Sequence, residues 1–259
     1  MTYLEALLTV VASGIVAAAA SWLVARSFTV ERRRIHHDVG VAVFAQIGIM
    51  LSVLMAFVFG QVWGEYRTAA MAIGDECAAL HGAAILSSAL PDGKGRPVIN
   101  AISTYAKAVV EDEWPMMARR RRSRVAEQDL EILLRRAADV RSSSAAEAAT
   151  QSQVISLLSL AHQNRETRTF QLTAAAPLLL WLMLIGMSAI LVLFVVCAGV
   201  ERPTNMVFAG VFAASVAMVL VVVRMLDLPF EGALALPSSD FLKLLGQVSR
   251  LASTPPLSG

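Results

Sequence analysis

The chain has 259 residues, of which 56% are hydrophobic and only 16% are charged, and its mean hydropathy is +0.62. That composition excludes an ordinary soluble globular protein and indicates a membrane protein. The formal net charge is +2, and the basic residues are not interleaved with aromatic ones, so no nucleic acid is expected as a partner.

The first hydrophobic segment, residues 4–25, contains a single charged residue, Glu5. In a secretory signal peptide positive charge precedes the apolar region, whereas here the arginines follow it. We therefore predict a transmembrane helix that is retained in the mature protein. Its small residues Gly14, Ala18 and Ser21 lie on one side, which favours close packing against another helix.

A short polar connector, residues 26–38, carries four arginines and two adjacent histidines. The arginines favour contact with anionic lipid headgroups. Because neighbouring side chains on a helix point in different directions, we do not expect His36 and His37 to share a metal ion, and the sequence predicts no metal site.

The second hydrophobic segment, residues 39–64, has no charged residue and is followed directly by Glu65. At about 1.5 Å per residue, a helix of this length exceeds the roughly 30 Å hydrocarbon core of a bilayer. We predict a transmembrane helix that continues into a soluble helix. With about 100° between successive residues, it has two chemically different sides. One side carries Gln46, Met50, Val53, Phe57, Gly60, Gln61 and Gly64, and the opposite side carries Leu51, Met55, Val58, Phe59 and Val62.

Both glutamines of this helix fall on the same side. A primary amide that points at lipid would lack hydrogen-bond partners, which is costly. The side with Gln46 and Gln61 is therefore expected to face protein or a water-filled path. Two interpretations stay open: the amides bridge packed helices, or they belong to a stripe that lines a pore.

Residues 65–168 hold most of the charged residues of the chain, and their apolar residues recur at helical spacing without the alternation typical of strands. We predict a soluble helical insert between the second and third spans. Pro91–Gly93 marks a turn, Trp114-Pro115 the end of a helix, and Ser142–Ser144 a break between two further helices.

The insert also contains two candidate binding features. Five arginines lie between Arg119 and Arg124, and we interpret them as a solvated helix start or as a contact for phosphate or lipid headgroups. Cys77 and His81 are four residues apart, but two ligands do not complete a zinc site. No motif of a metalloprotease, a serine hydrolase or a nucleotide-binding loop occurs, so we expect neither an enzyme nor a cofactor.

Residues 172–200 and 204–224 are two further apolar segments, predicted as the third and fourth transmembrane helices. Their connector is so short that the two helices must be antiparallel neighbours. Residues 225–259 are predicted as a C-terminal interfacial segment, with Phe241 on the apolar side of a short helix, followed by a disordered tail. The predicted fold is an all-α membrane protein with four transmembrane helices and a helical soluble insert between spans two and three.

Several short motifs occur in a fixed order around these predicted spans. In chain order they are Tyr66 and Glu76, Tyr105, Glu113-Trp114-Pro115, Pro177 and Trp181, and Asp227-x-Pro229-Phe230-x-Gly232. With these motifs and the spans between them, roughly residues 5–240 of the chain resemble the bacterial bestrophin-like domain family.

Bestrophins are ring-forming anion channels in which the second span lines a hydrophobic neck, and their soluble part is helical and cytosolic. The resemblance implies a homo-oligomer, such as a pentameric ring, in the inner membrane of a bacterial cell, with membrane lipid and inorganic anions as partners. Basic residues are balanced between the two sides of the membrane, so only the resemblance indicates that the termini and the insert are cytosolic. Bestrophins carry an acidic calcium clasp after the last span; this chain has no such cluster, so calcium gating is not expected.

From these patterns we expect an ion channel in which Val53 and Phe57 form a hydrophobic constriction between the amides of Gln46 and Gln61. Glu76 is a candidate charge filter. The remaining motif residues are expected to have structural roles: Tyr66, Tyr105, Glu113, Trp114, Pro115, Asp227, Pro229, Phe230 and Gly232. The alternative function is a non-conducting membrane scaffold or sensor whose helical insert binds a partner.

Overall fold

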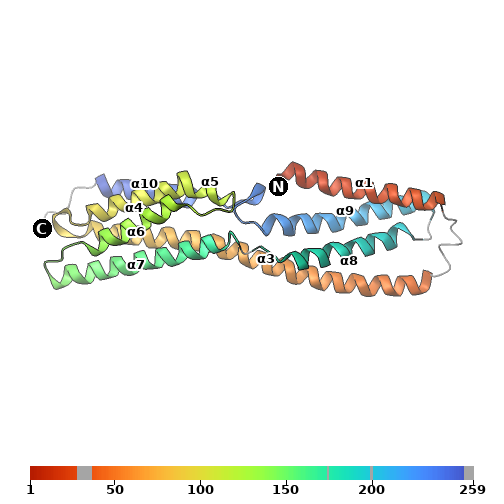
Figure 1. The fold of residues 1–259 in the computed structure, drawn as a ribbon, viewed down its shortest axis with the longest axis horizontal. Coiled ribbons are helices and arrows are strands. Elements are labelled where there is room, and N and C mark those ends of the chain that lie inside the picture. Colours follow the sequence, from red (N-terminus) through yellow and green to blue (C-terminus); the bar gives the residue numbers. More distant parts are fainter. Residues whose placement is uncertain (28–36, 174, 199–200, 254–259) are drawn as a thin grey trace. The chain divides into compact units, whose positions relative to one another are not determined.

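The computed structural model describes residues 1–27, 37–173, 175–198 and 201–253, in which every regular element is helical (Figure 1). His36 and most of the arginine-rich connector lie outside the described residues, as does the predicted disordered tail from residue 254. The chain divides into two compact units. We call Met1–Gly64 with Ala175–Leu228 the apolar unit, and Glu65–Ala174 with Pro229–Gly259 the charged unit.

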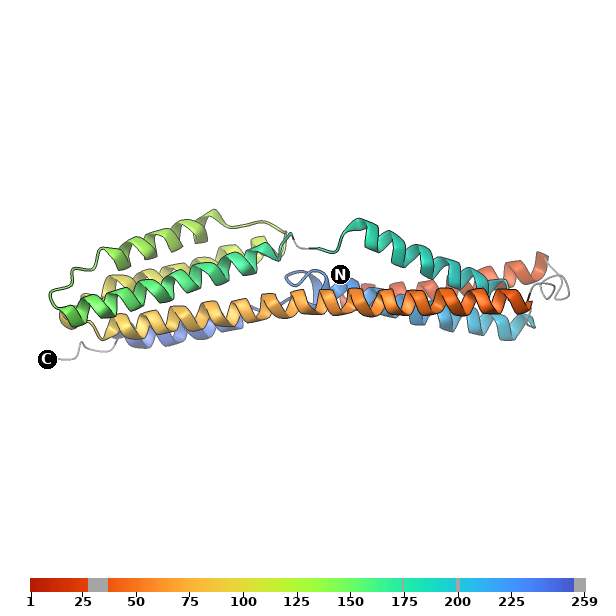
Figure 2. The same cartoon turned by 90° about the horizontal axis from the view of Figure 1, so that it is seen from below.

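The apolar unit contains α1 (Tyr3–Ser27), the first half of α3 (His37–Ser88), α8 (Leu178–Val196) and α9 (Arg202–Leu226). Each is long and apolar enough to cross a membrane. The fold class predicted from the sequence is therefore confirmed: the protein is all-α, with four membrane-length helices. The second of them runs without interruption past Gly64, as expected (Figure 2).

The third span begins later than predicted, at Leu178 instead of residue 172. Pro177 occupies the position before the helix in an extended conformation, with φ −55° and ψ 141°. Proline has no backbone N–H to donate and is tolerated at a helix start, so Pro177 marks the first place where this helix can begin.

Small residues bring α1 and α9 into close contact. A Cβ atom added to Gly14 would lie 3.0 Å from the carbonyl oxygen of Gly210 and 3.3 Å from the Cβ of Ala214. Further along, the amide nitrogen of Asn205 donates to the Ser21 hydroxyl at 2.8 Å. The small-residue side predicted for the first span is thus confirmed as a helix–helix contact, with a buried hydrogen bond between the two helices.

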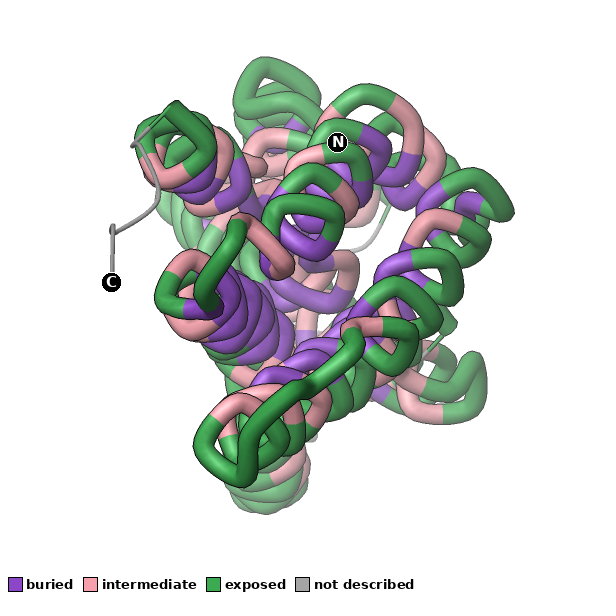
Figure 3. Tube along the Cα trace, turned by 90° about the vertical axis from the view of Figure 1, so that its left-hand side faces the viewer, coloured by how far each residue is buried: buried purple, intermediate pink, exposed green. Residues whose placement is uncertain are grey.

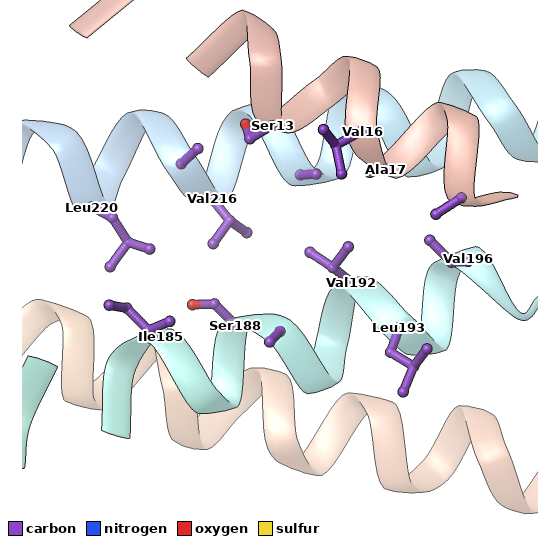
Figure 4. A pocket seen from close by; sticks show the side chains of 14 residues that line it. Ser13, Val16, Ala17, Ile185, Ser188, Val192, Leu193, Val196, Val216 and Leu220 are labelled. Carbon is purple, nitrogen blue, oxygen red and sulfur yellow. The ribbon is translucent and has the colours of Figure 1, made fainter. Parts of the chain in front are cut away.

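The third helix of this group, α8, packs less closely. Between α1, α8 and α9 lies an apolar cavity of about 430 Å³, lined by residues such as Val16, Val192 and Val216 (Figure 4). Ser188 lines this cavity, and its buried hydroxyl has no hydrogen-bond partner among the described residues. Apolar side chains fill the space between these three helices only in part.

The charged unit is a bundle built from the second half of α3 and the segments that follow it. In chain order these are η1 (Pro91–Gly93), α4 (Arg96–Ala108), the π-turn η2 (Val109–Glu113), α5 (Trp114–Met117), α6 (Arg124–Ala138), α7 (Ala145–Phe170), η3 (Gly232–Leu234) and α10 (Ser239–Ser253). Its core includes Leu80, Ile102, Leu133, Leu158 and Phe241, all buried. Seen end-on, the buried residues lie on the sides of the helices that face one another (Figure 3).

The structure agrees with one predicted helix boundary of this unit and differs from another. The break at Ser142–Ser144 is confirmed, because α6 ends at Ala138 and Ser144 caps α7 by accepting a hydrogen bond from the backbone of Glu147. The predicted helix end at Trp114-Pro115 is wrong. The helical backbone continues to Met117 through the π-turn, whose wider hydrogen-bonding pattern accommodates a proline that cannot donate.

The C-terminal helix is also placed differently from the prediction. An interfacial helix would lay its apolar side on lipid, but Phe241, Leu244 and Val248 of α10 are fully buried in the core of the charged unit. The same amphipathic pattern suits a lipid surface and a protein surface, and here α4 provides the apolar partner.

We predict that Gly14→Leu destabilises the apolar unit by about 1–3 kcal/mol, because a side chain at Gly14 collides with the backbone of α9. The thermal unfolding midpoint of the detergent-solubilised protein measures the effect. Gly186→Leu on α8 is the matched control, since a Cβ atom there meets nothing within 4 Å. Equal midpoints for the two variants would contradict the close approach of α1 and α9.

Candidate functional site

The predicted pore-lining side of α3 is uncovered in the single chain. All seven of its residues are exposed, and the exposed fractions of Met50, Val53 and Phe57 are 62%, 66% and 67%. On the opposite side Leu51, Val58 and Val62 are buried, Met55 is half-buried and Phe59 is 40% exposed. The chain therefore buries one side of this helix and leaves the other, which carries both glutamines, to its surroundings.

Aromatic packing anchors the buried side near the start of α3. The ring of Phe44 lies 6.2 Å from that of Phe194 on α8 and 5.9 Å from that of Phe212 on α9, measured between ring centroids. Tilted and edge-to-face pairs of this kind add to the energy of apolar burial. Because α3 is held from this side, its glutamine side is directed away from α8 and α9.

Glycine gives the uncovered side a flat end. A Cβ atom added at Gly60 or Gly64 would meet nothing within 4 Å. Neither glycine is therefore required by packing within the chain. Their small size leaves room at this end of the helix for another molecule, for a second copy of the chain or for water.

A second group of polar residues lies inside the charged unit. We call Glu76, Glu113, Arg165 and Arg168 the four-charge cluster; none has more than 1% of its surface exposed. They come from α3, the π-turn and α7, which are distant in the sequence. A buried charge is costly unless it is paired, so this arrangement depends on complete pairing.

The pairing is extensive. Arg168 donates to the Glu76 carboxylate through Nε at 2.9 Å and to the Glu113 carboxylate through a terminal nitrogen at 2.8 Å. Arg165 donates twice to Glu113 Oε1, at 2.7 Å and 3.2 Å. The Tyr105 hydroxyl completes the group by donating to Glu76 Oε1. Two carboxylates are thus balanced by two guanidinium groups in the interior of the unit.

These contacts and the burial shift the pKa values of Tyr105 and Arg168. Burial, followed by the charge of Glu76, raises the pKa of Tyr105 well above its ordinary value, so the phenol is neutral and acts as a donor. Burial alone would lower the pKa of Arg168, but Glu76 and Glu113 outweigh it and raise that pKa. The Tyr105 hydroxyl is therefore a neutral donor, and the Arg168 guanidinium stays charged.

The motif residues that carried the family resemblance meet around this cluster. The guanidinium of Arg168 lies 5.4 Å from the Trp114 ring centroid and 5.5 Å from that of Phe241. Trp114 in turn donates from its indole nitrogen to the Leu236 carbonyl at 3.1 Å and packs edge-on against Phe230. A single buried arginine thus joins the Glu-Trp-Pro motif to the segment that follows the last span.

The other motif residues support turns and helix ends. The Tyr66 hydroxyl donates to the Leu234 carbonyl at 3.0 Å, and Gly232 has a φ of 76°, which favours glycine. In the apolar unit the Asp227 carboxylate accepts from the backbone of Ala176 at 2.8 Å and lies 3.5 Å from Arg224. These contacts are of the structural kind expected for the motif.

Glu76 is not where a charge filter would need it. The sequence predicts a carboxylate that faces an axis in a ring, but this carboxylate is fully enclosed by Arg168 and Tyr105 within one chain. An enclosed and paired group has no surface to offer a passing ion. Glu76 therefore belongs to the buried four-charge cluster.

The sequence of α7 also contains a pattern that indicates the burial of Arg165 and Arg168. In α7 the buried positions Leu158 and Ala161 are followed by Arg165 and Arg168 at the same spacing of three and four residues. An apolar stripe that continues into arginines predicts that the arginines are buried too, and buried arginines require carboxylate partners.

Among the described residues, no group of three or more His, Cys, Asp or Glu is placed to hold a metal ion.

We predict that Arg168→Met destabilises the protein by about 3–5 kcal/mol, because it leaves the Glu76 and Glu113 carboxylates buried without their shared partner. The matched control is Arg135→Met, which removes an exposed arginine 3.8 Å from Glu131 and should change stability by less than about 1 kcal/mol. Chemical unfolding in detergent compares the two. Similar losses in both variants would refute the energetic role of the cluster.

Cys77 provides an independent measure of how well the cluster region is enclosed. Burial, with a smaller contribution from the charge of Glu76, raises the pKa of this thiol from 9.0 to about 12. The thiolate is the reactive form, so at pH 8 the native protein should react with iodoacetamide about a thousandfold more slowly than the unfolded chain. The measurement uses a Cys197→Ser background, because Cys197 is exposed. Rapid labelling of native Cys77 would show that the region opens.

Comparison with known proteins agrees with this architecture. No curated protein sequence matches the chain. Solved structures of a bacterial bestrophin homolog from Klebsiella pneumoniae are similar in fold. One solved by zinc phasing has a TM-score of 0.74 at 13% identity, covering 94% of this chain and 98% of that one. A single-substitution variant has a TM-score of 0.78 at 13% identity, covering 96% and 99%. The family model of the bestrophin-like domain matches residues 11–241, and the chain therefore belongs to the bestrophin-like family.

Proposed function

We propose that the chain is one subunit of a homo-oligomeric anion channel in a bacterial inner membrane, with the uncovered side of α3 lining its pore. The observation that carries the proposal is the division of α3 into a buried side and an exposed side that holds both glutamines. A ring of copies, such as a pentamer, would turn these exposed sides toward a shared axis and remove the amides from lipid.

The order of residues along this side suits a hydrophobic gate. Val53 and Phe57 are one helical turn apart and are both more than 60% exposed. Gln46 lies about 10 Å before Val53 and Gln61 about 6 Å after Phe57, at roughly 1.5 Å per residue. A ring of such helices would place a dry constriction between two rings of amide dipoles, where water and ions pass only when the constriction widens.

Family membership supports the remaining parts of the proposal. The pore-lining side carries no charged side chain, so the choice of anions rests on the family. So does the orientation that places the termini and the charged unit in the cytosol. The bestrophin homolog from Klebsiella pneumoniae has a similar fold, which supports a channel-type architecture.

We predict that Phe57→Ala increases anion flux into proteoliposomes several-fold, because it removes the bulkiest apolar side chain of the proposed constriction. Chloride flux is measured with a chloride-sensitive dye at equal protein content. The control is Phe208→Ala on α9, where a phenylalanine of similar exposure, 58%, undergoes the same truncation away from the proposed pore. This variant should conduct like the unmodified protein.

The outcomes separate the channel from the alternative. No flux from any of the three proteins, or a native mass equal to the 27.7 kDa of a single chain, would overturn the proposal. A stable oligomer without flux would favour the non-conducting scaffold or sensor. Equal increases for Phe57→Ala and Phe208→Ala would show that flux does not pass along the uncovered side of α3.

A further inference from the structure

We propose that Arg119, Arg121 and Arg124 form a binding surface for the phosphate groups of anionic lipid headgroups. Arg119 and Arg121 lie between α5 and α6, Arg124 is the first residue of α6, and the proposal does not depend on whether the protein conducts ions. It rests on three observations: the absence of acidic partners for these side chains, the ordered backbone that presents them, and the position of the segment in the charged unit.

The first observation concerns charge. Of the five arginines from 119 to 124, Arg120 pairs with Glu231 at 2.5 Å and Arg122 with Glu166 at 3.1 Å. The side chains of Arg119, Arg121 and Arg124 are exposed and make no ion pair with any described residue. Two acidic side chains lie nearby in the sequence. Asp112 accepts a hydrogen bond from Ser123, and Glu127 is exposed on the first turn of α6.

The second observation concerns order. The backbone nitrogens of Arg119 and Arg121 both donate to the Met116 carbonyl, at 2.8 Å and 3.0 Å. Arg120 has a φ of 57°, a strained value for a residue with a side chain, and its side chain pairs with Glu231. Ser123 then caps α6 by accepting from the backbone of Ala126 at 3.1 Å. The arginines are therefore presented by a fixed turn, which lowers the entropy lost when they bind a ligand.

The third observation concerns position. Glu231, the partner of Arg120, is five residues beyond Leu226, where the fourth membrane-length helix ends. Five residues span at most about 17 Å. In the charged unit this same segment is bound by Tyr66, which follows the second apolar stretch by two residues. Two independent points of the chain thus put the arginines at the end of the charged unit from which it joins the membrane spans.

Position and charge together select the ligand. A cluster of cationic side chains within reach of the membrane surface meets a layer of phosphodiesters, and arginine binds phosphate through parallel N–H donors. Free inorganic phosphate offers the same oxygen atoms, but only a lipid is concentrated at this surface. We infer that the occupant is an anionic phospholipid, with the arginine turn resting on its headgroup.

The test is a titration of the full-length protein in neutral detergent with tail-labelled phosphatidylglycerol, followed by fluorescence anisotropy. The variant is the triple substitution Arg119→Gln, Arg121→Gln and Arg124→Gln. Each arginine near an anionic surface contributes roughly fivefold to binding, so the three together should weaken the apparent affinity about 100-fold. The affinity of the unmodified protein should also fall as salt is raised, because salt screens these contacts.

The matched control is the triple substitution Arg135→Gln, Arg136→Gln and Arg141→Gln. It removes the same charge from exposed positions at the far end of α6 or just beyond it, and α6 is about 22 Å long at roughly 1.5 Å per residue. Its affinity should match that of the unmodified protein. Equal thermal midpoints for all three proteins without lipid establish that the substitutions leave the fold intact.

Several outcomes would overturn the inference. Unchanged lipid binding by the first triple variant would remove the arginines from the site. Equal weakening in both triple variants would reduce the effect to overall charge. Displacement of the labelled lipid by millimolar inorganic phosphate, with no displacement by unlabelled phosphatidylglycerol, would assign the site to the free ion. Equally tight binding of tail-labelled phosphatidylcholine would show that the headgroup charge is not recognised.

Discussion

The charged unit depends on one requirement, that two carboxylates and two guanidinium groups buried together must all be paired. Arg168 lies at the centre, since it binds both Glu76 and Glu113 and is covered by Trp114 and Phe241. Apolar packing tolerates small shifts of register, but these hydrogen bonds are lost if α3, α4 or α7 slides by one residue. Because buried ion pairs contribute little net stability, the benefit we infer is a unique alignment of the helices.

The apolar unit follows a different rule, because lipid is as apolar as its side chains and gives the helices no reason to associate. Close backbone contact supplies the missing attraction between α1 and α9, where Gly14 meets Gly210 and Asn205 binds Ser21. On the glutamine side of α3, by contrast, all seven residues named above are exposed. Within the chain, α3 therefore has one buried side and one exposed side.

The sequence was sufficient for features that depend on local pattern. It predicted the four apolar helices and the small-residue contact of α1. It was insufficient for contacts between segments that are distant in the sequence. The hydrophobic side of α10 suits lipid as well as it suits α4, and nothing local to Trp114-Pro115 reveals a π-turn that lets a helix continue. Glu76 was misplaced for the same reason, because its partner is 92 residues away.

The arginines show most clearly what sequence leaves open, since two groups of the same residue have opposite fates. Arg165 and Arg168 continue the apolar stripe of α7 and are therefore buried. Because a buried charge needs a partner, they pair with the carboxylates of Glu113 and Glu76. Arg119, Arg121 and Arg124 lie on the turn before α6 and on its first residue, and none of them pairs with a carboxylate of the described residues. A guanidinium that the fold does not neutralise keeps its attraction for anions outside the chain. The buried group therefore specifies the bundle, while the exposed group is the part that we propose to bind anionic lipid headgroups.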